Sequence, residues 1–225
     1  MSHELRTPLT AIKGALSLLL NQISSDPAVT QNLLNVAFRN TQVLQNLVND
    51  ILDFEMMRQK GLAFVDSDVD LVALCKACIE QLETYAEQYG VTLKLQTSTD
   101  ANLLWIKADS GRIAQVLFNL VSNAIKYSPR EGMVTLTVKE EATKVHVGIQ
   151  DQGQGFSNSA STKLFQYFSQ IDSSDARKKG GTGLGLAISK AIIDHYQGEI
   201  GFESEPGKGA YFYFELDRSP HTTIP

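Results

Sequence analysis

The chain has 225 residues, of which 43% are hydrophobic and 20% charged, and its formal net charge is −5. These values are ordinary for a soluble globular protein of one or two domains. The acidic balance argues against a general nucleic-acid binder, which usually needs a basic face, but it permits a nucleotide site, which needs only local positive charge.

The sequence predicts no membrane contact from this segment. No apolar run is long enough to span a bilayer, and the first residues lack the apolar core of a signal peptide. We therefore expect a soluble, cytosolic segment, which a longer parent protein could still anchor to a membrane.

Residues 1–60 predict two helices joined by a short turn. Apolar residues recur at alternating spacings of four and three over residues 5–23 and again over 34–51, which is the pattern of a heptad seam. A Ser-Ser-Asp-Pro break separates the runs, and Ser25 or Asp26 can cap the second helix. One hairpin cannot bury both of its apolar faces alone, so we expect a homodimer in which two hairpins form a four-helix bundle.

The pattern after residue 60 predicts an α/β sandwich, in which helices cover one face of a mixed sheet. Residues 61–70 have the composition of a linker, 71–217 form the domain itself, and 218–225 are predicted to be a loose tail. With the helical hairpin, the fold class of the whole chain is α+β. The residue spacing predicts helices that end at residue 89 or span 109–127 and 184–196. It predicts strands over 91–96, 104–108, 133–140, 144–150, 199–204 and 210–216. Between the strand ending at 150 and the last helix, residues 157–181 are predicted to form a polar loop with a short helix near 164–168.

The first helix of this domain has recognisable ends and carries both cysteines. Asp70 can cap its start, and Gly90 suits the left-handed conformation that closes a helix. Cys75 and Cys78 have the spacing of a redox or half-zinc motif, but the chain has no second cysteine pair. Both lie in an apolar helical pattern, so we interpret them as small core residues, with a redox pair as the alternative.

A polar stripe runs along the helix predicted over residues 109–127. Asn119, Asn123 and Lys126 are spaced by four and three and therefore share one helical face. Two amides and an ammonium group suit Mg²⁺ and phosphate, because Mg²⁺ takes few protein oxygens and keeps water and phosphate oxygens as its other ligands. A solvated helix face is the alternative interpretation.

Two glycine-rich segments follow. Asp151-Gln-Gly-Gln-Gly155 comes directly after a strand, where an aspartate can accept a hydrogen bond from the exocyclic amine of adenine and the glycines allow close backbone approach. A plain turn is the alternative there. Residues 180–186 hold four glycines and open a helix whose unpaired N–H groups can face an anion. They are not a Walker loop, and Ile188 stands where a dinucleotide fingerprint needs its third glycine.

The order and spacing of these motifs resemble those of the histidine kinase family, whose ATPase domain is similar to those of gyrase, the mismatch-repair ATPase and the heat-shock chaperone. The resemblance covers nearly the whole chain, from Ser2 to about Leu216. The matching segments are a phospho-acceptor box at residues 2–9, an asparagine box at 119–129, glycine boxes at 151–155 and 181–185, and a phenylalanine box at 165–168.

The resemblance implies a role for each matching residue. Asn123 is the expected Mg²⁺ ligand with Asn119 beside it, Lys126 meets phosphate, Tyr127 lines the base pocket, and Asp151 binds the adenine amine. The other nucleotide contacts that it implies are Gly153, Gly155, Phe156, Lys179, Gly181, Thr182, Gly183, Leu184 and Gly185.

At the start of the chain, the resemblance makes His3 the phospho-acceptor. Glu4 can hold the other ring proton of the imidazole, and Thr7 lies on the same helical face, where it would orient water in a phosphatase reaction. Because His3 would otherwise stand on a fraying helix end, we expect the chain to be cut from a longer protein.

The function that follows is that of a sensor histidine kinase of a two-component system. It would use ATP and Mg²⁺ to phosphorylate His3 and then transfer the phosphoryl group to an aspartate of a response regulator receiver domain, with a possible phosphatase activity toward that partner. One rival is a gyrase-type ATP hydrolase, which carries a glutamate base where this chain has Asn119. The second rival is a non-catalytic module that has kept the fold.

Overall fold

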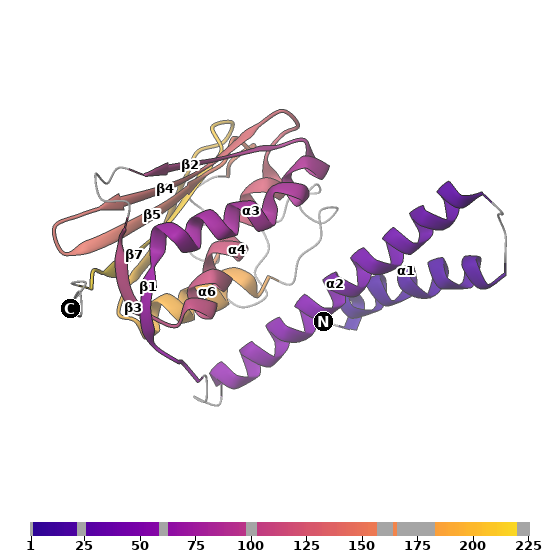
Figure 1. Ribbon diagram of the computed structural model, residues 1–225, viewed down its shortest axis with the longest axis horizontal. Coiled ribbons are helices and arrows are strands. Elements are labelled where there is room, and N and C mark those ends of the chain that lie inside the picture. Colours follow the sequence, from indigo (N-terminus) through magenta and orange to yellow (C-terminus); the bar gives the residue numbers. More distant parts are fainter. Residues whose placement is uncertain are drawn as a thin grey trace. The chain divides into compact units, whose positions relative to one another are not determined.

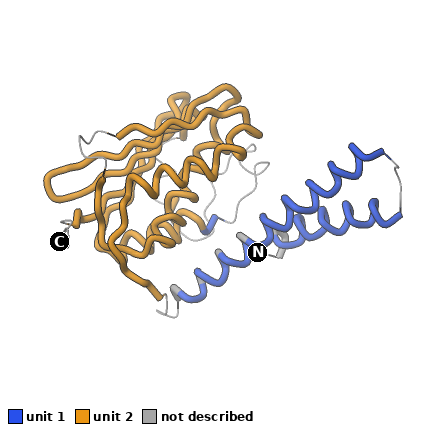
Figure 2. Tube along the Cα trace, viewed as in Figure 1, with its two compact units in different colours: residues 1–62, 180–184 blue, residues 63–179, 185–225 orange. Residues whose placement is uncertain are grey.

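The computed structural model describes residues 2–21, 26–58, 63–97, 103–156, 164–165 and 183–219. The chain divides into two compact units, which Figure 2 draws in different colours. The first comprises residues 1–62 with 180–184, and the second comprises residues 63–179 with 185–225.

The first unit contains a pair of long helices, α1 (Ser2–Leu20) and α2 (Pro27–Arg58), which pack against each other (Figure 1). The start of α2 is capped by Asp26, whose Oδ1 accepts a hydrogen bond from the Ala28 N–H at 2.8 Å. This is one of the two caps that the sequence predicts. Ala15 on α1 and Ala37 on α2 are buried, and their small side chains allow the two helices to approach closely.

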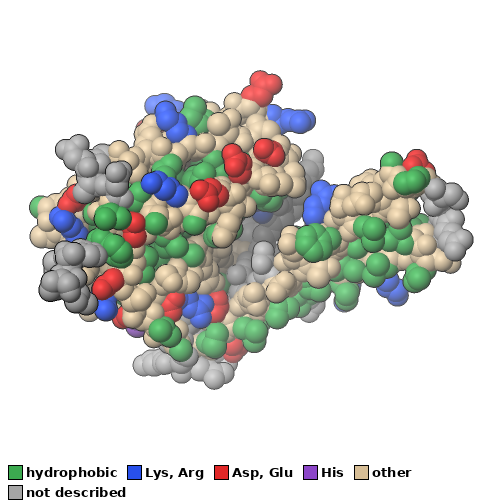
Figure 3. All heavy atoms as spheres, in the orientation of Figure 1, with side chains coloured by type: hydrophobic (Ala, Val, Ile, Leu, Met, Phe, Trp, Pro, Cys, Tyr) green, Lys and Arg blue, Asp and Glu red, His purple; other side chains and the backbone are tan. Residues whose placement is uncertain are grey.

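The helical hairpin exposes far more apolar surface than the rest of the described chain. Eleven of the fifteen exposed large apolar side chains in the described residues lie on α1 and α2, and Figure 3 shows hydrophobic side chains along the visible face of the hairpin. On α2, Leu34, Phe38, Val48 and Leu52 are 44–64% exposed and share one helical face by their spacing. Monomeric proteins rarely leave a stripe of this kind in water.

The second unit is built on a five-stranded mixed sheet (Figure 1). Only β2 and β4 are parallel, and the other neighbours are antiparallel. Three helices cover one face of the sheet, namely α3 (Leu71–Tyr89), α4 (Ser110–Tyr127) and α6 (Gly185–His195). The strands lie in the order β2 (Thr92–Thr97), β4 (Met133–Glu140), β5 (Lys144–Gln150), β7 (Ala210–Asp217) and β6 (Glu199–Ser204).

The core of this unit lies between the helices and the sheet. Alternate residues of β4 and β5 are fully buried, and the stripe of α4 that begins at Ile113 packs onto them. Apart from β1, the strands and helices that the sequence predicts for this unit agree with the observed ones to within one or two residues at each end. The polar loop predicted over 157–181, with its short helix near 164–168, lies outside the described residues except for positions 164–165.

The end of the predicted linker is a strand. β1 (Ser67–Asp70) pairs antiparallel with β3 (Trp105–Ala108) in a separate two-stranded sheet, and Val69 is buried there. Three of the four residues of β1 are polar, so its sequence carries little strand signal. The pairing partner, nearly forty residues further on, determines its conformation.

Helix α3 has both of its predicted ends. Asp70 Oδ1 accepts from the backbone N–H groups of Val72 and Ala73 at 3.0 and 3.2 Å, and Gly90 closes the helix with φ +66°.

Cys75 and Cys78 are free and buried, as expected for core residues. Burial raises the pKa of the Cys78 thiol to about 12 and raises that of Cys75 as well, so neither resembles a reactive thiolate. Among the described helices, none is long and apolar enough to cross a membrane.

We expect the exposed face of α2 to be covered by a second copy of the chain. Replacing Phe38 with glutamate places a charge in this face and should reduce the mass measured by light scattering to about half that of the wild type. Asn32→Glu, an exposed change on the other side of α2, is the matched control and should leave the mass unchanged. A dimer that persists in Phe38→Glu at low micromolar concentration would exclude this face as the interface.

Candidate nucleotide site

A buried carboxylate stands where β5 ends. Asp151 is 5% exposed, and its Oδ1 accepts hydrogen bonds from the backbone N–H groups of Gly153 at 2.7 Å and Ala210 at 3.1 Å. In return, the Asp151 N–H donates to the Ala210 carbonyl at 2.9 Å. Among the described residues, no donor reaches Oδ2, so this oxygen remains available to an N–H group of a ligand.

The environment of Asp151 makes such a ligand favourable. Burial raises the pKa of its carboxyl group, although the hydrogen bonds from Gly153 and Ala210 lower it in part. A buried carboxylate loses the hydration that an exposed one keeps. An incoming N–H donor would restore a charge-assisted hydrogen bond, which is stronger than one between neutral groups.

The glycines after Asp151 are required by close backbone packing. A Cβ atom at Gly153 would lie 2.7 Å from the Tyr127 carbonyl oxygen. Gly155 has φ +58°, and a side chain there would collide with the Glu205 carbonyl group. Gly209, which the sequence did not single out, packs in the same way against the backbone of Asp151. The loop after β5 therefore packs between the end of α4 and the start of β7, with no room for a side chain at its glycine positions.

Helix α4 carries the predicted amide stripe along a partly buried face. Asn119 Nδ2 donates to the Gly185 carbonyl oxygen at 3.2 Å and lies 3.5 Å from Ser189 Oγ, so it joins α4 to the first turn of α6. Asn123 lies one turn further on, and its side chain makes no hydrogen bond with another described residue. Its side-chain oxygen therefore fits the kind of ligand that Mg²⁺ takes from a protein.

The end of α4 carries three further polar groups. Lys126 Nζ lies 5.8 Å from the centre of the Tyr127 ring, and burial raises the pKa of the Tyr127 hydroxyl. The Ser128 hydroxyl, which the sequence did not point to, is buried with no hydrogen-bond partner in the described part of the chain. A buried hydroxyl without a partner is uncommon in folded proteins, so Ser128 marks this end of α4 as unusual.

The structure places the second glycine segment at the start of α6. Gly183 has φ +65°, and a Cβ atom at Gly185 would lie 3.3–3.4 Å from the side chain of Asn119. Leu184, also a predicted contact, is buried. The N–H groups at the start of this helix can face an anion. Lys179, Gly181 and Thr182 lie outside the described residues.

Phe156 occupies a different environment from the other predicted contacts. Its backbone N–H donates to Ser204 Oγ at 2.9 Å, and its ring packs with those of Phe202 and Phe212 at centroid distances of 5.4 and 6.4 Å. The Phe165 ring, from the predicted phenylalanine box, also reaches Phe202 at 6.0 Å. Phe156 therefore anchors the end of the loop to β6 and β7 through an aromatic cluster.

The predicted phospho-acceptor segment lies on α1. His3 and Glu4 belong to this helix by their backbone, and their side chains lie outside the described part. Thr7 is exposed one turn further along.

The fold and the site define the class of protein, an ATP-binding domain joined to a helical hairpin. The family model described as histidine kinase-, DNA gyrase B- and HSP90-like ATPase matches residues 108–220. A second model, the His Kinase A phospho-acceptor domain, matches residues 1–60. The chain belongs to the histidine kinase family, and it forms the catalytic core of such a kinase.

Curated relatives and solved structures agree with this assignment. The sensor histidine kinase WalK of Bacillus subtilis is 34% identical over 96% of this chain and 35% of that protein. The sensor histidine kinase GacS of Pseudomonas protegens is 37% identical over 96% of this chain and 24% of that protein. The chain thus spans about a quarter to a third of the length of these relatives.

Two solved structures match almost the whole chain. The histidine kinase AdeS of Acinetobacter baumannii superposes with a TM-score of 0.70 at 26% identity, over 97% of this chain and 98% of that one. Full-length ShkA in complex with AMPPNP superposes with a TM-score of 0.73 at 29% identity, over 98% of this chain and 45% of that one.

The hydrogen bond from Asn119 to α6 predicts a stability effect. In Asn119→Asp, an ionised side chain can only accept and would face the Gly185 carbonyl oxygen, which should lower the free energy of unfolding by about 1–3 kcal/mol. Urea titration followed by the fluorescence of Trp105, the single tryptophan, measures the loss. Asn123→Asp, one turn along, is the matched control and should cost much less. Equal stability of the Asn119→Asp variant and the wild type would show that this hydrogen bond does not hold α4 to α6.

Proposed function

We propose that the chain is the catalytic core of a sensor histidine kinase in a two-component system. It binds ATP, phosphorylates His3 and passes the phosphoryl group to an aspartate on a response regulator. The single observation that carries the proposal is the Asp151 carboxylate, buried and held by two backbone N–H groups with its second oxygen available. The match to full-length ShkA in complex with AMPPNP supports a nucleotide at this site.

In this proposal Asp151 recognises the base. Its Oδ2 accepts a hydrogen bond from the adenine amine, while Gly153 and Gly155 keep the loop free of side chains that would fill the pocket. Tyr127 lines the pocket beside the loop, where its carbonyl oxygen faces Gly153.

The phosphate end would meet the polar stripe of α4 and the start of α6. Asn123 would hold Mg²⁺ through its amide oxygen, and the metal ion would neutralise phosphate charge. Lys126 contributes a positive charge at the end of α4. Gly181, Gly183 and Gly185 offer backbone N–H groups to the phosphates, and Lys179, Thr182 and Leu184 complete the predicted contacts.

The phosphoryl transfer itself needs a nucleophile and a proton acceptor. The neutral imidazole of His3, a form favoured above its ordinary pKa of about 6.5, attacks the γ-phosphorus. A nitrogen–phosphorus bond forms as the bond between phosphorus and the bridging oxygen breaks, and ADP leaves. Glu4 accepts the other ring proton, and Thr7 on the same helical face would orient water when the kinase acts as a phosphatase on its partner.

The geometry of Asn119 favours this transfer over simple hydrolysis. Its amide donates to the Gly185 carbonyl oxygen, and an amide cannot take a proton from water. The described site therefore contains no base at the position where a gyrase-type hydrolase would need one. ATP held there would keep its γ-phosphoryl group for His3.

The partners follow from the helical hairpin. Its exposed apolar face supports a homodimer in which two hairpins form a four-helix bundle. The histidine kinase ThkA in complex with the response regulator protein TrrA superposes with a TM-score of 0.69 at 26% identity, over 97% of this chain. That match supports a receiver domain as the partner that takes the phosphoryl group.

Asp151→Asn should weaken recognition of the base while preserving the fold. The asparagine oxygen can still accept from Gly153 and Ala210, but its NH₂ group would then face the adenine amine, so two donors would meet. We expect the affinity for Mg-ATP, measured by calorimetry, to fall about 10–100-fold. Asp217→Asn, at an exposed carboxylate on β7, is the control and should bind like the wild type. Undiminished affinity in Asp151→Asn would place the base elsewhere.

Labelling with γ-³²P-ATP and Mg²⁺ tests the phospho-acceptor. The wild type should acquire a phosphoryl label that is lost in acid and stable in base, as expected for phosphohistidine. His3→Gln should lose the label but keep its affinity for the nucleotide, whereas Asn123→Ala should lose both labelling and Mg²⁺-dependent binding. A label retained in His3→Gln would contradict the assignment of the acceptor.

A further inference from the structure

The face of the sheet that the helices leave uncovered carries an ordered polar network. His146 on β5 and Tyr211, Tyr213 and Glu215 on β7 all project from this face, because their neighbours along each strand are buried in the core on the other side. The Tyr211 ring lies so close over Gly148 that a side chain there would collide with it. Stacking of His146 on Tyr213 at a centroid distance of 5.3 Å further fixes the imidazole.

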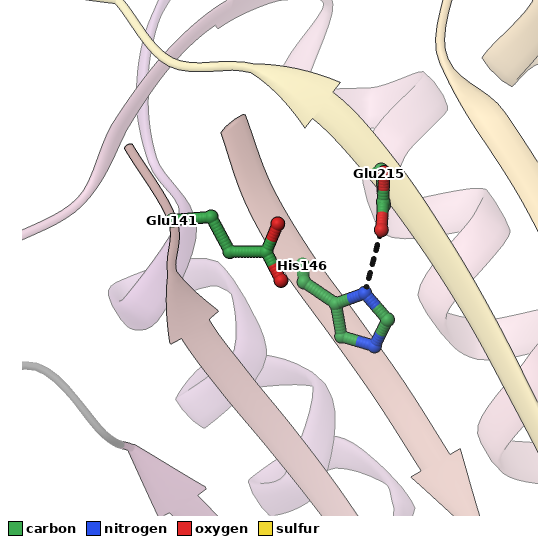
Figure 4. Close-up of side chains that lie close together, drawn as sticks. All are labelled: Glu141, His146 and Glu215. Atoms are coloured by element: carbon green, nitrogen blue, oxygen red, sulfur yellow. Dashed lines mark hydrogen bonds and ion pairs between the residues drawn. The ribbon is translucent and has the colours of Figure 1, made fainter. Parts of the chain in front are cut away.

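Three potential metal ligands converge at one end of this network. Glu141 follows β4, His146 lies on β5 and Glu215 lies on β7, and their ligand atoms are all within 4.8 Å of one another (Figure 4). His146 Nδ1 and Glu215 Oε1 are 3.1 Å apart. Two ligands bound at ~2.1 Å to a tetrahedral ion stand about 3.4 Å apart, so the separation of this pair is close to the required one.

The imidazole of His146 is held by a partner on its other nitrogen. Nε2 lies 2.6 Å from the Tyr211 hydroxyl oxygen. When Nε2–H donates to this oxygen, Nδ1 carries a lone pair directed at the Glu215 carboxylate. Two acceptors cannot face each other at 3.1 Å without a positive centre between them. Either a proton on Nδ1 or a metal ion fills this position.

The carboxyl groups of the network favour a cation, and Lys144 competes with a metal ion for Glu215. Glu141 and Glu215 place two carboxyl groups beside the imidazole of His146. Lys144 Nζ binds Glu215 Oε2 at 3.2 Å, and the exposed Lys139 lies opposite His146 on β4. The Lys144 side chain is 41% exposed and can swing into water, so its ion pair opposes a metal ion without blocking it.

We propose that Glu141, His146 and Glu215 bind a divalent transition-metal ion of the zinc type on the sheet face opposite to the helices. One imidazole with two carboxylates suits Zn²⁺ better than Mg²⁺, which prefers oxygen ligands alone. Water completes the coordination, and the ion would tie the turn after β4 to β7. The proposed metal site shares no residue with the nucleotide site or with the phospho-acceptor segment.

Calorimetric titration of the full chain with ZnCl₂, without nucleotide or Mg²⁺, tests the site. We expect a binding event that is lost in His146→Gln and weakened at least about tenfold in Glu141→Gln, an exposed position where folding is not at risk. Tyr211→Phe should also weaken it about tenfold or more, because the partner that orients the imidazole is removed. Lys144→Gln should strengthen it severalfold by freeing Glu215.

The direction of the Lys144→Gln effect separates a metal site from a structural ion-pair network. In the network alone, this change would only remove an ion pair and would bring no gain in zinc affinity. Thermal unfolding provides a second readout, since saturating ZnCl₂ should raise the Tm of the wild type and not that of His146→Gln. Titration curves that are the same in the wild type, His146→Gln and Glu141→Gln would overturn the proposal.

Discussion

The nucleotide site depends on the way the Asp151 carboxylate is divided between two tasks. One oxygen accepts from Gly153 and Ala210 and so fixes the turn after β5 against the start of β7. The other oxygen is left in a desolvated position that favours an incoming N–H donor. The small residues around it follow from this arrangement, because a side chain at Gly153 or Gly209 would displace the backbone that holds the carboxylate.

The rest of the catalytic domain positions the phosphate end relative to that carboxylate. The Asn119 amide connects α4 to the start of α6, so its hydrogen bonds link the helix with the predicted Mg²⁺ ligand to the helix that opens from the glycine segment. Because this amide acts as a donor in the fold, it is unsuited to activate water. Under the proposed function, the stability of the site and the protection of ATP from hydrolysis would rest on the same residue.

Local signals in the sequence were sufficient for most of the fold. Asp70 and Gly90 define the ends of α3 because capping depends only on neighbouring backbone groups. The strand over residues 67–70 could not be predicted, since its conformation comes from pairing with β3. Within the site, motif spacing pointed to Asp151, but the buried hydroxyl of Ser128 became apparent only from its packing, which no spacing reveals.

The most direct test of this account is a crystal structure of the chain with a non-hydrolysable ATP analogue and Mg²⁺. We predict the exocyclic amine of adenine about 2.7–3.2 Å from the second carboxylate oxygen of Asp151, with Oδ1 still bound to the backbone of Gly153 and Ala210. An analogue bound with its base away from this carboxylate, or a loop rearranged so that both oxygens contact the backbone, would contradict the account.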